Sequence, residues 1–101
     1  MILPPEKCQS MLELRAQIDV LDTELMGLLA KRVGYIDRAA ELKQTELLPA
    51  RIEWRIQEVL DKARENAAKV GFDTVLAEKL WRDMIEWSIK REAAILEKES
   101  K

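Results

Sequence analysis

Three ionisable side chains, Arg32, Lys43 and Glu92, stand at positions where the helical pattern around them predicts an apolar residue. Arg32 falls between a leucine four residues before it and an isoleucine four residues after it, and Lys43 follows an alanine by four residues. Eleven residues at about 100° each bring Lys43 to within about 20° of Arg32 around a helix, three turns further along. A cation directed at a core is costly unless an anion meets it. The pattern therefore predicts an anionic partner from another helix, another chain or a ligand.

Glu92 shares one side of its predicted helix with Ser88. The two residues follow Met84 by eight and four residues, on the side that Ile85 and Ile95 are expected to bury. Two explanations fit such polar positions. One is an internal salt-bridge network, or long side chains whose charged ends reach water. The other is a pocket between helices that receives a small anion.

Arg15 lies about 100° around the helix from Arg32, on the wrong face for a pocket within the same chain. Alone it would be an ordinary surface arginine, but a second copy of the helix could present it to the site. The tryptophans of the chain are expected in the core or in an interface rather than as stacking platforms. They are Trp54, Trp81 and Trp87.

The elements that position these residues are three predicted helices. The first runs from Ser10 to about Leu47, opens on a capping-box spacing, and ends before Pro49, which cannot continue it. The second covers about Arg51 to Lys69 and stops at a glycine. The third, capped by Asp73, reaches about Lys98, with inward positions at Leu76, Leu80, Met84, Ile85 and Ile95. Met1 to Gln9 is expected to be irregular.

A first helix of about 38 residues would be about 57 Å long. A compact monomer of this size has a radius of gyration of only about 13 Å. One chain alone cannot bury such a helix, so the sequence predicts a homodimer in which a second copy covers the rest of its apolar stripe.

Composition narrows the class of protein. A chain of 101 residues makes a single domain, 1–101, and 48% hydrophobic with 36% charged residues indicates a soluble, mostly helical protein. The net charge of -2 argues against nucleic acid, and no apolar run is long enough for a membrane. Cys8 is the lone cysteine, which favours a reducing compartment, and the cytoplasm is expected.

The sequence contains no histidine, which excludes histidine-based triads, HExxH zinc sites and imidazole acid–base catalysis. One cysteine cannot build a Cys-rich metal site, and there is no glycine-rich phosphate loop. No metal or cofactor is expected.

The stretch LRAQIDVLDTELMGLLAKR, followed by Lys43 eleven residues after Arg32, resembles the signature of the all-helical chorismate mutase family. The similarity continues through Pro49, Arg51 and Arg55 to Ser88 and covers essentially the whole chain. PEKC near the start, VGFD before the third helix and IEWSI within it are most similar to the isochorismate-pyruvate lyase branch.

The resemblance implies an all-α intertwined dimer with two active sites, each completed by an arginine of the other chain. Arg32 and the second copy's Arg15 would bind the carboxylates of a dicarboxylate substrate, chorismate or isochorismate. Lys43 would reach the ether oxygen and a carboxylate, with Ser88 also at the substrate.

Two positions depart from the pattern of this family. Glu92 stands where many members have a glutamine that donates a hydrogen bond to the ether oxygen, so it must be protonated to do the same. Ile56 stands where typical mutases have a glutamate that binds the substrate's ring hydroxyl, and Ile52 replaces a nearby aspartate. The resemblance makes chorismate mutase the leading prediction. The departures keep isochorismate-pyruvate lyase as a close alternative, and a non-catalytic helical dimerisation or regulatory module is the third.

Overall fold

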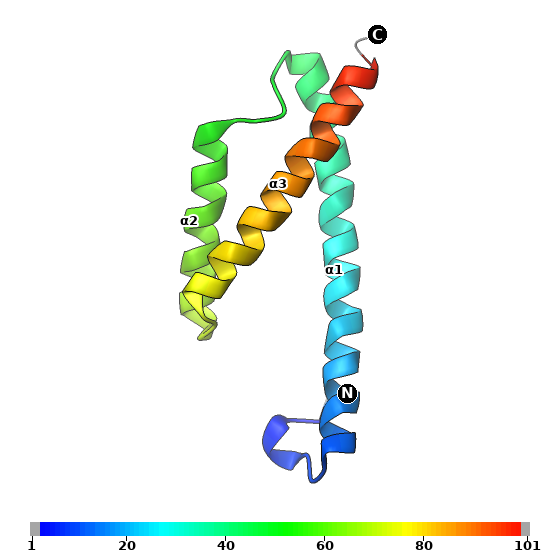
Figure 1. Cartoon of the computed structure of the whole chain (residues 1–101), viewed down its shortest axis with the longest axis vertical. Helices are drawn as coiled ribbons and strands as arrows, with labels where there is room; N and C mark the ends of the chain where they lie inside the picture. Colours follow the sequence, from blue (N-terminus) through cyan, green and yellow to red (C-terminus); the bar gives the residue numbers. More distant parts are fainter. Residues whose placement is uncertain (1–2, 100–101) are drawn as a thin grey trace. The chain divides into compact units, whose positions relative to one another are not determined.

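The computed structural model describes residues 3–99, and all regular elements in this part of the chain are helical. A short 3-10 turn precedes three α-helices (Figure 1). Their bounds are η1 Pro5–Lys7, α1 Met11–Glu46, α2 Glu53–Val70 and α3 Thr74–Glu99. The α-helices lie within two residues of the predicted ones. The turn η1 corrects the expectation of an irregular start, because Pro5 supplies the φ angle that a first helical position needs.

Contacts divide the chain into two compact units, Met1–Gly34 and Tyr35–Lys101, and the boundary falls inside α1. The single domain expected from chain length stays a prediction. No helix in the described range 3–99 is both long enough and apolar enough to cross a membrane.

The N-terminal unit begins α1 with the predicted cap. The backbone N–H of Glu13 donates to Ser10 Oγ at 3.2 Å, and the Glu13 carboxylate accepts the N–H of Gln9 at 2.7 Å. In a standard capping box that carboxylate would accept from the cap residue itself. The segment before the helix folds back on it, because the N–H of Leu3 donates to Gln17 Oε1 at 2.8 Å.

The apolar residues of this unit are not covered by the chain itself. None of the residues 3–34 is buried. Large exposed side chains follow the helix at three- and four-residue spacing: Ile18, Leu21, Leu25 and Leu28. Within this unit the apolar stripe of the long first helix is therefore exposed.

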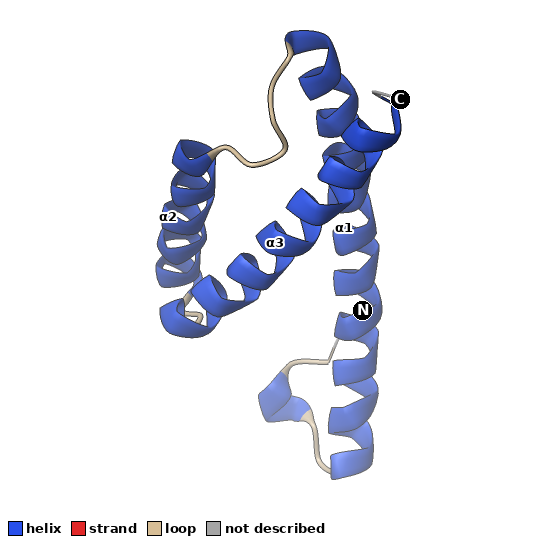
Figure 2. Cartoon of the chain, turned by 45° about the horizontal axis from the view of Figure 1, so that its top comes forward, coloured by secondary structure: helices blue, strands red, loops and turns tan. Residues whose placement is uncertain are grey.

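The C-terminal unit has its core where α2 and α3 pack against each other, at an angle that opens away from the turn between them (Figure 2). Small residues let these helices approach closely, and Leu60 is the one fully buried large side chain among the described residues. The buried apolar residues are Ala40, Leu60, Ala63, Ala67, Ala77 and Ile85.

Several apolar side chains predicted to point inward are exposed. Leu76 and Leu80 of α3 are both more than 40% exposed, and Trp54 is 70% exposed. Ala77 takes the buried place between the two leucines, because an alanine allows the close approach of α2 that a leucine would prevent. Trp87 is also exposed, so neither it nor Trp54 belongs to a core within one chain.

Two helix ends use the left-handed conformation. Gly71 ends α2 with φ 75°, as predicted, and Leu47 follows α1 with φ 58°. Leu47 is unusual because a Cβ disfavours this region. Asp73 caps α3, since its Oδ1 accepts the N–H of Leu76 at 2.8 Å.

Candidate functional site

The buried polar side chains of the described chain lie one turn apart on α3. Ser88 and Glu92 are each only 4% exposed. They sit on the face that also buries Ile85, as the sequence pattern predicts. A carboxyl group at this depth requires a charged or hydrogen-bonding partner.

Lys43, in the last turns of α1, supplies that partner. Its Nζ lies 2.8 Å from Glu92 Oε1, and the side chain is 18% exposed. The ammonium also donates to the backbone oxygen of Ala50 at 2.7 Å. Lys43 therefore joins α1, the α1–α2 loop and α3, as the salt-bridge explanation of this lysine predicts.

The contact between Lys43 and Glu92 is an ion pair by distance but not a hydrogen bond by geometry. This oxygen is buried and accepts no hydrogen bond. A lysine ammonium has three N–H donors, and one is used by Ala50. The pair thus keeps both donor and acceptor capacity that a polar ligand could use.

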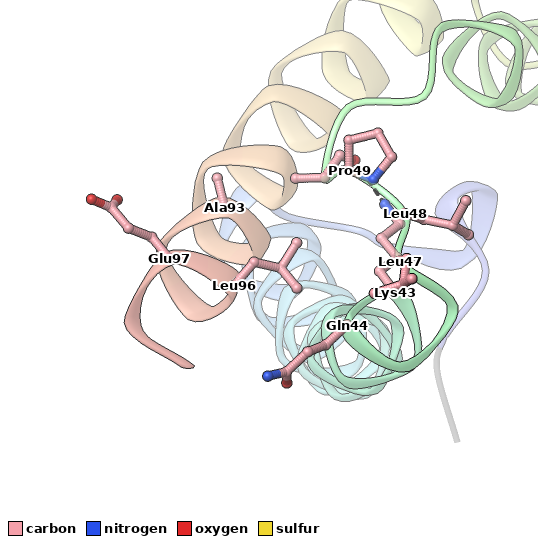
Figure 3. A pocket seen from close by; sticks show the side chains of 9 residues that line it. Lys43, Gln44, Leu47, Leu48, Pro49, Ala93, Leu96 and Glu97 are labelled. Carbon is pink, nitrogen blue, oxygen red and sulfur yellow. Dashed lines mark hydrogen bonds between the residues drawn. The ribbon is translucent and has the colours of Figure 1, made fainter. Parts of the chain in front are cut away.

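A pocket of about 480 Å³ opens beside Lys43. Its walls come from the end of α1, the α1–α2 loop and the C-terminal half of α3 (Figure 3). Leu96 points toward the end of α1, whereas Glu97 extends away from the pocket. The lining residues are Lys43, Gln44, Leu47, Leu48, Pro49, Ala50, Ala93, Leu96 and Glu97. An ammonium beside a largely apolar wall suits a small organic anion.

The remaining predicted site residues lie near the start of α2 or in the N-terminal part of α1. Ile56, like Ile52, is half-buried at the start of α2. Arg15 and Arg32 belong to the N-terminal unit, where Arg15 is exposed and Arg32 is half-buried. Among the predicted site residues, Lys43 and Glu92 contact each other directly.

Sequence reasoning missed two features around this contact. The backbone oxygen of Ala50 has no side-chain signature, so only the path of the loop could reveal it. The second is an ion pair between Asp37 of α1 and Arg91 of α3. Exposed charges at helical spacing look like an ordinary solvated face, and neither residue interrupts an apolar stripe.

Electrostatics at these exposed pairs favour the charged forms. The hydrogen bond from Arg91 holds the pKa of Asp37 below its usual value, and the Asp37 carboxylate raises the pKa of Arg91. Arg51 in the α1–α2 loop lowers the pKa of Glu86 in the same way. Both carboxylates therefore stay ionised in mildly acidic solution.

In the part of the chain that the structure describes, fold and site together define an all-helical protein in which a lysine–carboxylate pair joins two helices beside a pocket. The family model described as chorismate mutase type II matches residues 14–93. The chain is 30% identical over 88 residues to the isochorismate pyruvate lyase of Pseudomonas aeruginosa, an alignment that covers 84% of this chain and 83% of the relative. The comparison with solved structures found no match.

The chain belongs to the chorismate mutase type II family. This confirms the resemblance recognised in the sequence, including its leaning toward a lyase relative. The residues matched by the family model include Lys43, Ser88 and Glu92.

Proposed function

We propose that the protein is a chorismate mutase, which converts chorismate to prephenate by a pericyclic rearrangement. The observation that carries this proposal is the buried Lys43–Glu92 pair at 2.8 Å, on helices of a chain that belongs to the family. A lysine ammonium that is 18% exposed can meet a substrate oxygen with little competition from water.

Lys43 is proposed to act on the ether oxygen of the substrate. In the rearrangement the breaking carbon–oxygen bond leaves partial negative charge on this oxygen. A fixed ammonium stabilises that charge more in the transition state than in the ground state, which is the condition for catalysis. No nucleophile or general base takes part, so a site without histidine is sufficient.

Glu92 is proposed as the second group at the ether oxygen. Only the protonated acid can donate a hydrogen bond there. Glu92 Oε1 accepts no hydrogen bond from the chain, so substrate binding need not break one at that atom. Ser88, one turn earlier and equally buried, would contact the substrate from the same face of α3.

Arg32 and Arg15 are proposed to hold the two carboxylates, with Arg15 supplied by a second copy of the chain. Two bidentate arginines would hold the flexible enolpyruvyl arm over the ring, which removes much of the entropic part of the barrier. The exposed apolar side chains of α1 support the homodimer, since a second copy would cover them.

Isochorismate-pyruvate lyase is the second candidate. In this reaction the same pocket would fold isochorismate so that a ring hydrogen passes to the enolpyruvyl group, which releases pyruvate and salicylate. Two observations favour it. The curated relative carries that name, and half-buried Ile52 and Ile56 offer no carboxylate for a ring hydroxyl.

One experiment separates these functions. Purified protein is incubated with chorismate and, separately, with isochorismate, and prephenate, salicylate and pyruvate are quantified. Prephenate from chorismate supports the mutase, and salicylate with equimolar pyruvate from isochorismate supports the lyase. Absence of turnover with both substrates, at acidic and neutral pH, would reject both and favour a non-catalytic dimerisation or regulatory module.

A further inference from the structure

A second ion pair joins the two helices that carry Lys43 and Glu92. Arg91 Nε lies 2.5 Å from Asp37 Oδ1, and Arg91 Nη2 lies 3.1 Å from Asp37 Oδ2. Both oxygens of the carboxylate are engaged by the flat guanidinium, and such a contact fixes direction as well as distance. The two side chains are 42% and 38% exposed, and ion pairs at such exposure add little to stability. The contribution of this pair is therefore to fix the relative direction of the two helices where they meet.

Trp87 restrains the arginine of this pair. It precedes Arg91 by one helical turn on α3, and the guanidinium carbon lies 5.5 Å from the centroid of an indole ring. This is within the range of a cation–π contact. The ring limits the rotamers of a long side chain, so the guanidinium is already directed when Asp37 meets it.

The pair stands next to the proposed active site on both helices. Arg91 is the sequence neighbour of Glu92, and Asp37 precedes Lys43 by six residues, which is about 9 Å along α1. One contact between two helices leaves them free to turn about it. A second contact at a different height removes that freedom.

We propose that Asp37 and Arg91 are positioning residues, which set how α3 crosses the end of α1 and so hold the Glu92 carboxyl group at Lys43. The proposal rests on the proposed function, because it assigns these two residues a part in the same catalytic site. Neither residue touches the substrate. Because each partner keeps the other charged, the contact persists across neutral pH.

The first test measures turnover of whichever substrate, chorismate or isochorismate, the protein converts in the incubation experiment. Asp37→Asn removes the charge but keeps the shape, and Arg91→Lys keeps the charge but loses the flat fork. We expect kcat to fall about tenfold or more in both variants, because small displacements at a reacting group are costly. KM should change by no more than about twofold, since the groups that hold the carboxylates remain.

The matched control is Glu86→Gln. It breaks the 2.6 Å pair between Arg51 and Glu86, which is as exposed as the Asp37–Arg91 pair and also involves α3. This variant should retain wild-type kcat and KM. The exchanged pair, Asp37→Arg with Arg91→Asp, should regain part of the lost kcat, which a purely local effect of either substitution would not allow. Wild-type kcat in both Asp37→Asn and Arg91→Lys would overturn the proposal.

The second test does not depend on turnover. A double-mutant cycle with Lys43→Met and Glu92→Gln measures their coupling in urea unfolding, once in the wild-type background and once with Asp37→Asn. We expect the coupling to fall by about half in the second background. Equal coupling in both backgrounds would overturn the positioning role. Reduced coupling in a protein that turns over neither substrate would keep that role and reject the proposed function alone.

Discussion

At position 43 a lysine ammonium is held by the backbone oxygen of Ala50 and lies beside a buried carboxylate of another helix. A lysine is suited to this place because its charge is compact and its three donors can be redirected. Glu92 is the residue that distinguishes this site from one with a glutamine, since its ability to donate depends on its proton. Both predictions at the residue scale follow from this pair.

Lys43→Ala should lower kcat by about 10²–10³-fold, the usual effect of removing one group that stabilises developing negative charge. Steady-state kinetics measure the loss, and far-ultraviolet circular dichroism checks that helicity is kept. Lys90→Ala is the matched control, because Lys90 is exposed on α3. Retention of wild-type kcat in Lys43→Ala would remove this lysine from the mechanism.

Glu92→Gln should change the dependence of kcat on pH. If Glu92 acts as proposed, only its protonated form can donate to the ether oxygen, so kcat of the wild type should fall as pH rises. The glutamine amide donates at every pH, and the profile of the variant should lose that fall. Two superimposable profiles would show that Glu92 is not the hydrogen-bond donor.

At the scale of elements, the ends of the helices decide where the site residues stand. Leu47, in the left-handed region, turns the chain out of α1 four residues after Lys43. The loop that follows brings the backbone oxygen of Ala50 to the lysine ammonium. Gly71 makes the corresponding turn after α2 without a side chain in the way. The left-handed conformation is thus strained at Leu47, after α1, and relaxed at Gly71, after α2.

Leu47→Gly should raise the free energy of unfolding by about 0.5–1 kcal/mol, because it relieves a left-handed residue and the lost side chain is almost fully exposed. Leu47→Ala keeps the strain and should not stabilise. Gly71→Ala should cost about 1 kcal/mol through backbone strain alone, since nothing lies within 4 Å of the added Cβ. Urea denaturation measures all three, and destabilisation by Leu47→Gly would contradict the account.

The α3 ion pairs predict a loss of stability in acid. The pKa values of Asp37 and Glu86 are lowered in the folded chain from 3.8 and 4.5. The two ion pairs contribute to the free energy of unfolding at pH values above these unfolded-state pKa values. That contribution disappears as the pH falls through the lower pKa values of the folded state. The double variant Asp37→Asn/Glu86→Gln should show a shallower decline of unfolding free energy below about pH 4.5. An unchanged slope would show that the pairs do not persist in solution.

At the scale of the whole molecule, the exposed apolar positions of α1 pose the main question. None of the residues 3–34 is buried, although leucine and isoleucine recur there at helical spacing. A second copy of the chain, as proposed, would cover these residues and bring Arg15 to the site. The proposal links assembly to catalysis, so both can be tested together.

Arg15→Ala and Lys43→Ala chains should each be inactive alone and regain activity when refolded together. If each site takes Arg15 from one chain and Lys43 from the other, half of the dimers are mixed, and each mixed dimer has one intact site of two. Activity should then reach about one quarter of wild type. Recovery near zero, with a dimer seen by sedimentation, would place Arg15 and Lys43 of each site on the same chain.

The sequence by itself determined the helices and the unusual places of Lys43, Ser88 and Glu92. Periodicity and caps are local properties, so the helix ends came within two residues, and a polar residue on an apolar stripe is visible without coordinates. The motif from Leu14 to Lys43 also sufficed for the family, and the comparisons confirm that family.

Only the tertiary structure decided which groups meet. Ala77 rather than Leu76 or Leu80 is buried against α2, because helix packing depends on side-chain volume at the crossing, which periodicity does not contain. The Ala50 oxygen at Lys43 and the Asp37–Arg91 contact depend on the path of a loop and the crossing of two helices. These are relations between residues distant in the chain, and no local pattern records them.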